Sequence, residues 1–187
     1  MILPIYTYGH PVLRKVAQDI PTDYPGLAEL INDMYETMDA SSGVGLAAPQ
    51  IGKSIRVVVI DLDVLKDDFP EYEGFRRAFI NAHIVEVDDK SEKVVMDEGC
   101  LSVPGLSEKV ARYSRIHVQY LDETLQPHDE WVEGYLARVM QHEFDHLEGV
   151  VYTDSISPLR KQLVKNKLRG IMQGKFNCSY RTKTARK

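Results

Sequence analysis

Apolar residues recur at helical spacing in one part of the chain, and other local signals predict two further helices. Between residues 24 and 39 they form one stripe along an otherwise polar segment, at Leu27, Leu30, Ile31, Met34 and Met38. A stripe with this period is typical of a helix that packs one face on a hydrophobic core. A second helix is predicted over 135–147, because Gly149 follows at the position that favours glycine after a helix end. A third helix is predicted over 158–170.

Four segments rich in Val, Ile and aromatic residues are predicted to be strands: 55–61, 78–87, 92–96 and 115–121. The Gly- and Ala-rich segment 43–52 is predicted to be a loop or an irregular edge strand that runs close to another part of the molecule. Residues 63–74 are predicted to be an inserted surface loop. Strands followed by flanking helices indicate an α+β domain, with mixed or antiparallel sheets around the 135–147 helix and a further helix near the C-terminus.

The chain has 187 residues, of which 43% are hydrophobic, and this size and composition suit one globular domain. We therefore expect a single domain over 1–170 and a flexible basic tail over 171–187. The N-terminal segment lacks the basic region of a secretory signal, and no apolar run approaches the roughly 20 residues that span a bilayer. These features predict a cytoplasmic protein with no membrane partner.

Charge is unevenly distributed along the chain. Residues 159–187 carry ten Lys or Arg and no Asp or Glu, and since the net charge of the chain is −5, the first 158 residues carry −15. An acidic body with a basic end favours contact of that end with a polyanion such as nucleic acid. A solvated tail that aids solubility is an equally good interpretation of this pattern.

The residues with the clearest chemistry lie in the predicted helix over 135–147. His142, Glu143 and His146 form an HExxH pattern, which puts two imidazoles on one helix face where they can share a metal ion, beside a carboxylate that can act as a base. A surface helix can carry this pattern by chance, so the prediction of a metal site depends on finding a third ligand. Zinc proteases take theirs from a downstream Glu or His. Here no histidine follows His146, and Tyr152 occupies the position of the third metzincin histidine.

The third ligand is therefore expected upstream of this helix. The candidates are His10, His83, His117, His128 and Cys100. A lone histidine in a strand or turn is more often structural. Only two cysteines occur, and they lie far apart, so no disulfide is expected and Cys100 is predicted to be a free thiol. Gly99 and Pro104 bracket a predicted short exposed turn at Cys100, although a lone cysteine is more often a buried apolar residue.

Three segments resemble the signature motifs of the peptide deformylase family, in the same order: GVGLAAPQ at 43–50, EGCLS at 98–102 and QHEFDH at 141–146. The segment YGHPVLRK near the N-terminus is similar to the family's opening, so the resemblance runs from about Tyr8 to Asp154. The chain departs from the commonest sequence of the family at Phe144 and in the 63–74 insertion. These departures bear on the shape of the pocket and on loop dynamics rather than on the reaction.

The resemblance implies a catalytic domain that hydrolyses the formyl group from the N-terminal formylmethionine of newly made polypeptides and releases formate. It implies that Cys100, His142 and His146 bind the metal ion, with Fe²⁺ as the ion in the cell and Zn²⁺, Ni²⁺ or Co²⁺ as substitutes. Three protein ligands leave a fourth position for water, which is the arrangement of a catalytic site, and the ion lowers the pKa of that water from about 15.7 towards 7. Glu143 is expected to accept the water's proton and to pass it to the leaving amine.

The resemblance also assigns roles to residues that the pattern of the chain does not single out. The side-chain amide of Gln50 and the backbone N–H of Leu101 are expected to stabilise negative charge on the formyl oxygen. The substrate would bind as an added strand. The substrate-binding candidates are the backbone groups of Val44, Gly45 and Gly99 and the apolar pocket residues Tyr135 and Val139.

Two further expectations concern the surroundings of the site. Asp145 lies between two ligands and is expected to hold the helix through an ion pair with Arg112. In the family a C-terminal helix is associated with docking at the ribosome, and residues 158–170 with the basic tail fit that role.

Two other functions share part of these features. A zinc endopeptidase would use the same HExxH helix, but it would cleave internal peptide bonds and take a third ligand other than Cys100. A binding module with a structural metal site would need a fourth protein ligand, and the sequence offers no obvious residue for it.

Overall fold

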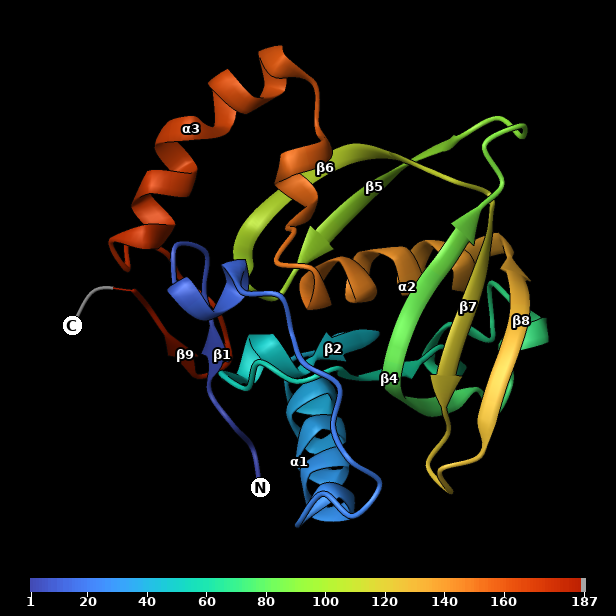
Figure 1. Ribbon diagram of the computed structural model, residues 1–187. Coiled ribbons are helices and arrows are strands. Elements are labelled where there is room, and N and C mark those ends of the chain that lie inside the picture. The colour runs from blue at the N-terminus through green and yellow to red at the C-terminus, as the bar shows by residue number, and fades with distance from the viewer. Residues whose placement is uncertain (186–187) are drawn as a thin grey trace.

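The computed structural model describes residues 1–185, and Figure 1 shows its helices and sheets. The α-helices are α1 (Leu27–Ala40), α2 (Gly134–Leu147) and α3 (Pro158–Met172). The largest sheet is antiparallel, in the order β2 (Gly45–Ala47), β3 (Val57–Asp61), β4 (Arg76–Val87), β7 (Arg115–Leu121) and β8 (Pro127–Glu133). An antiparallel pair consists of β5 (Val94–Cys100) and β6 (Val103–Arg112), and a short parallel pair of β1 (Ile5–Tyr6) and β9 (Thr182–Lys183). The predicted α+β fold is confirmed.

The largest sheet is covered on its two faces by different helices. β3 is buried along its whole length, and its side chains alternate between the faces. Val57 and Val59 pack in one apolar cluster with the α1 stripe, whereas Val58 and Ile60 pack in a second cluster with α2. The helix that carries the HExxH pattern therefore lies inside the molecule, between this sheet and the β5–β6 pair (Figure 1).

The three predicted helices agree closely with the structure. The apolar stripe of α1 is buried at Leu30, Ile31, Met34 and Met38. The segment 43–52 contains the edge strand β2 followed by a 3-10 helix, Ala48–Ile51, and the 63–74 insertion contains two short 3-10 helices, Asp63–Leu65 and Pro70–Tyr72. No helix within residues 1–185 combines the length and apolar character needed to cross a membrane.

Neither β6 nor β8 is predicted from the sequence pattern, for two different reasons. In β6 alternate side chains are buried, but Glu108 and Arg112 occupy two of the buried positions, so the alternation is not one of apolar with polar residues. In β8 only Val132 is buried, because this strand lies at the edge of the sheet. A pattern search for apolar residues therefore misses both strands.

The turn that contains Cys100 is less exposed than predicted. Cys100 pairs with Val103 across an irregularity in the β5–β6 ladder, and Leu101 and Ser102 form the turn between them. Ser102 and Val103 are fully buried. The N-terminal segment covers the turn, and the backbone N–H of Tyr8 donates to the Ser102 carbonyl over 2.7 Å. The prediction of a turn is confirmed, and the prediction that it is exposed is wrong.

The predicted boundary at residue 170 does not coincide with a break in the fold. Helix α3 continues to Met172, and part of the predicted tail returns to the N-terminal segment as β9. This placement differs from a free tail, because the backbone N–H groups of Ile5 and Thr7 donate to the carbonyls of Arg181 and Lys183. Residues 186 and 187 of the predicted tail lie outside the described residues. The flexibility of this segment stays a prediction.

Candidate active site

Two elements bring three metal-ligating side chains together. His142 and His146 lie one turn apart on the buried side of α2, and Cys100 ends β5. The Sγ of Cys100 is 3.4 Å from Nε2 of His146, and ligand atoms of all three residues lie within 4.8 Å of one another. Cys100 is a free thiol. Of the five upstream candidates, Cys100 is the one that groups with these two histidines in the described part of the chain.

The chemistry of this group fits a transition metal. One thiolate and two imidazoles are ligands that Zn²⁺ and Fe²⁺ accept. Nδ1 of His142 is 2.8 Å from Oε1 of Glu98, which leaves Nε2 of His142 free for an ion. Burial lowers the pKa of His146, which favours the neutral form of this imidazole, the form that binds metals.

Glu98 links His142 to two buried arginines. Its carboxylate accepts a bidentate pair of hydrogen bonds from Arg112, of 2.8 and 2.9 Å, and a further one from Arg138. Burial acts to raise the pKa of Glu98, but the hydrogen bonds from Arg112 and His142 outweigh it and lower the pKa to about 2. Glu98 is therefore a carboxylate at neutral pH. The expected ion pair between Arg112 and Asp145 is present at 2.5 Å.

The roles of Glu98 and Arg138 are not predicted from the sequence. Glu98 lies in the EGCLS motif, but only the fold shows that its side chain points to His142. Arg138 lies in the largely buried helix α2, where a buried charge needs a partner, but Glu98 is the one buried residue of the mostly exposed strand β5, so no pattern in that strand singles it out.

Glu143 is held against the backbone of β2. Its side chain is 5% exposed, and its Oε2 has no hydrogen-bond partner within the described residues. A Cβ atom on Gly45 would lie 2.5–2.8 Å from side-chain atoms of Glu143, so only glycine allows this approach. Burial raises the pKa of Glu143 to about 7. A carboxyl group with this pKa can both accept and release a proton near neutral pH.

Gln50 lies beside the metal-ligating cysteine. Its Oε1 accepts a hydrogen bond from the backbone N–H of Ala47 at 2.9 Å, and this contact directs the amide nitrogen toward Ser102 and Cys100. Nε2 is 3.2 Å from Oγ of Ser102 and 3.5 Å from Sγ of Cys100. The amide is therefore an N–H donor at the candidate metal centre.

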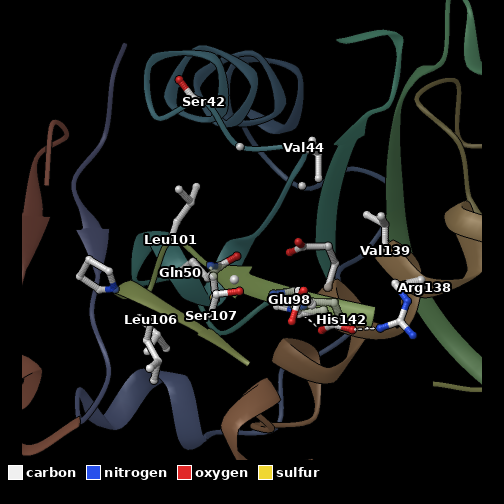
Figure 2. A pocket seen from close by; sticks show the side chains of 18 of the residues that line it. Ser42, Val44, Gln50, Glu98, Leu101, Leu106, Ser107, Arg138, Val139 and His142 are labelled. Carbon is white, nitrogen blue, oxygen red and sulfur yellow. Dashed lines mark hydrogen bonds and ion pairs between the residues drawn. The ribbon is translucent and has the colours of Figure 1, made fainter. Parts of the chain in front are cut away.

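A cavity of about 500 Å³ opens in front of these residues. In Figure 2 Gln50 and Leu101 lie on one side of it, Val139 and Arg138 lie on the other, and Glu98 and His142 lie between them. Every predicted catalytic and substrate-binding residue lines this cavity: Val44, Gly45, Gln50, Gly99, Leu101, Tyr135, Val139 and Glu143. Lining residues that are not predicted from the sequence include Leu106, Arg138 and Tyr180.

The 63–74 insertion supports one wall of the cavity. The ring of Phe69 stacks on Tyr135, with 5.1 Å between ring centroids and an interplanar angle of 10°. The hydroxyl of Tyr72 accepts a hydrogen bond from the backbone N–H of Leu136 at 3.0 Å, in the first turn of α2. That N–H has no partner inside the helix, so Tyr72 caps α2. The insertion is therefore joined to the helix that carries the histidines.

Comparison with known proteins gives a consistent result over nearly the whole chain. The family model described as polypeptide deformylase matches residues 2–162. A peptide deformylase of Flavobacterium johnsoniae is 47% identical, over 99% of this chain and 97% of that protein, and one of Salinibacter ruber is 41% identical, over 96% and 93%.

Solved structures agree with this assignment. A peptide deformylase of Plasmodium falciparum superposes with a TM-score of 0.81 at 34% identity, covering 91% of this chain and 95% of that one. One of Legionella pneumophila gives a TM-score of 0.78 at 36% identity, covering 95% and 100%. The chain belongs to the peptide deformylase family, the metal-dependent hydrolases that remove the N-formyl group from the N-terminal methionine of newly synthesised polypeptides.

Proposed function

We propose that Cys100, His142 and His146 hold an Fe²⁺ ion and that the cavity beside them binds the formylmethionyl end of the substrate. The observation that carries this proposal is that the three ligand atoms lie within 4.8 Å of one another at the wall of a cavity that Glu143 also lines. When bound, a divalent ion at three protein ligands supplies a water molecule that ionises near neutral pH.

Glu143 is the proton carrier in this proposal. Its Oε2 is buried without a hydrogen-bond partner in the described residues, and its pKa of about 7 suits a group that first accepts a proton from water and then donates it. The amine of the departing polypeptide is the acceptor, since it leaves readily only when protonated.

Two N–H donors face the reacting carbonyl group in this proposal. The Nε2 of Gln50 and the backbone N–H of Leu101 both belong to the side of the cavity at which Cys100 lies. Donors that are already oriented stabilise the negative charge that develops on the formyl oxygen, and loss of one such donor typically costs about 10²–10³-fold in kcat. The contact of Gln50 with Ala47 supports this orientation.

The open edges of two strands suit an extended peptide. β2 is an edge strand of the largest sheet, and β5 pairs only with β6 among the described strands. Backbone groups of Val44, Gly45 and Gly99 lie at these edges and line the cavity, so the substrate would add as a strand. The methionine side chain would then lie against Tyr135 and Val139.

Formate release from formyl-Met-Ala by the ferrous protein tests these roles. Replacement of Glu143 by Ala should lower kcat by at least about 100-fold, the scale of general acid–base catalysis, while the protein keeps its metal. Cys100→Ser should reduce metal content as well. Full formate release by the Cys100→Ser variant would contradict the proposed ligand set.

Fe²⁺ as the cellular ion is tested by anaerobic purification with elemental analysis. Cys and His ligands accept several divalent ions, so the ligand set alone does not select one. We expect one iron per chain and loss of activity on exposure to air. Stoichiometric zinc with full turnover would count against iron.

We further propose that the chain acts as a single catalytic domain in the cytoplasm, where nascent chains are made, and that the basic segment 159–187 also contacts the ribosome. The charge of residues 159–187 supports the ribosome contact, because this segment contains ten Lys or Arg residues and no Asp or Glu. Ribosome pelleting should fall as salt rises. Replacing Lys161 and Lys165 by Glu should reduce pelleting at low salt, and unchanged pelleting would exclude this contact.

A further inference from the structure

The C-terminal segment of the chain returns to the candidate active site. After α3 it reaches the N-terminal segment, where β9 pairs in parallel with β1 (Figure 1). The pairing is anchored by hydrogen bonds from the N–H of Ile5 to the carbonyl of Arg181, 2.9 Å, and from the N–H of Thr7 to the carbonyl of Lys183, 3.0 Å. This fixes the position of Tyr180, which lies two residues before the start of β9.

Tyr180 makes a direct contact with the turn beside Cys100. Its hydroxyl donates a hydrogen bond of 2.8 Å to the backbone carbonyl of Leu101. The ring is half-buried against the apolar cluster to which Leu101 also packs, and Tyr180 lines the cavity. Tyr180 therefore forms a hydrogen bond with a turn that lies about 80 residues earlier in the sequence.

Three parts of the molecule form hydrogen bonds with this turn. The N-terminal segment holds the carbonyl of Ser102 through the N–H of Tyr8, and Gln50 holds the Ser102 hydroxyl. Tyr180 holds the remaining carbonyl, that of Leu101. The N–H and C=O of one residue are related by only two soft dihedral angles, so anchoring the carbonyl of Leu101 restricts the direction of its N–H.

We propose that Tyr180 is a positioning residue for deformylation, which keeps the Leu101 N–H directed at the formyl oxygen. The inference rests on the proposed role of the Leu101 N–H as an oxyanion donor. It gives the C-terminal segment a role within the catalytic unit that is independent of any ribosome, because the contact is internal to the chain.

The test compares Tyr180→Phe with the native protein, both loaded with the same metal, in hydrolysis of formyl-Met-Ala without ribosomes. Phe keeps the ring and removes the hydroxyl, so the donor at Leu101 is displaced rather than lost. We expect kcat to fall by about 10-fold, less than the 10²–10³-fold cost of losing a donor, with KM within about two-fold of the native value because the cavity keeps its lining. The amide resonances of Leu101 and Ser102 should shift in zinc-loaded protein.

Tyr35→Phe is the matched control. The hydroxyl of Tyr35 donates to Glu123 at 2.7 Å, and its ring packs on the same apolar cluster as Tyr180. This variant should lower the melting temperature to a similar extent and leave kcat unchanged. Tyr180→Ala removes both the ring and the hydroxyl. If kcat is low in Tyr180→Ala but native in Tyr180→Phe, only the packing of the ring matters, and the proposal is overturned.

Failure of this inference can be told apart from failure of the proposed function. A native protein that releases no formate contradicts the function itself. A native protein that is active, is impaired by Gln50→Leu and is unaffected by Tyr180→Phe contradicts only the role of Tyr180.

Discussion

At Glu98 a single buried carboxylate contacts His142, Arg112 and Arg138, and each contact has a different consequence. The contact with Nδ1 orients the imidazole for a metal, and the hydrogen bonds from Arg112 and His142 keep the carboxylate in its ionised form. Arg112 also reaches Asp145 on α2, so the position of the helix relative to β5 and β6 depends on one ionic network. A network of this kind is stable only while every member is paired.

Replacement of Glu98 by Gln should therefore weaken metal binding and the fold together. We expect zinc affinity to fall by about 10–100-fold, as for other residues that orient a ligand, and the free energy of unfolding to fall by about 3–5 kcal/mol, because two arginines lose a buried partner. Chelator competition and thermal unfolding measure the two effects. Glu130→Gln, an exposed substitution on β8, is the control, and native zinc affinity in the Glu98 variant would contradict the prediction.

Among the elements, the 63–74 insertion contributes more than a surface loop. Its two aromatic side chains, Phe69 and Tyr72, contact the first turn of α2 at Tyr135 and Leu136. The insertion thus supports a wall of the cavity and caps the helix that bears His142. Loop aromatics that pack on a binding wall restrict its movement, so the insertion affects substrate affinity rather than the chemistry of the metal.

Phe69→Ala should raise KM for formyl-Met-Ala and leave kcat nearly unchanged. An aromatic pair contributes about 0.5–1.5 kcal/mol beyond its buried area, which corresponds to about a 2–10-fold increase in KM. Steady-state kinetics on formyl-Met-Ala measure it. Val64→Ala, at an exposed position of the same insertion, should match the native enzyme, and an unchanged KM in the Phe69 variant would show that the stacking has no role in binding.

On the scale of the whole molecule, the candidate ligands join two layers. Cys100 belongs to the β5–β6 pair, whereas His142 and His146 belong to the helix that packs on the largest sheet. An ion bound to all three would link these layers, so we expect it to bind the folded chain more tightly than the unfolded chain. Metal binding would then stabilise the fold by mass action.

Removal of the metal should lower the melting temperature. At a free ion concentration 100 times Kd the stabilisation is about 2.7 kcal/mol, which for a chain of this size corresponds to about 5–10 °C. Differential scanning calorimetry before and after chelation under anaerobic conditions measures the change. Readdition of the ion should restore the original temperature. In Cys100→Ser, chelation should have little effect, and an equal loss in that variant would argue against Cys100 as a ligand.

Local patterns determined the main elements and the chemistry. The apolar period defines α1, Gly149 marks the end of α2, and the HExxH spacing puts His142 and His146 one turn apart, because a helix has 3.6 residues per turn. The three motifs indicated the family. Such features depend on residues close in sequence, where backbone geometry alone relates one side chain to the next.

The tertiary structure decided the remaining features, since they join residues far apart in the chain. It placed Cys100, and not one of the four histidines, beside His142 and His146 by bringing the end of β5 to α2, and it brought Glu98 of β5 together with Arg112 of β6 and Arg138 of α2. It also brought Tyr180 to the turn at Leu101. Long-range contacts follow from how the sheets and helices pack, and no local period in the sequence records that packing.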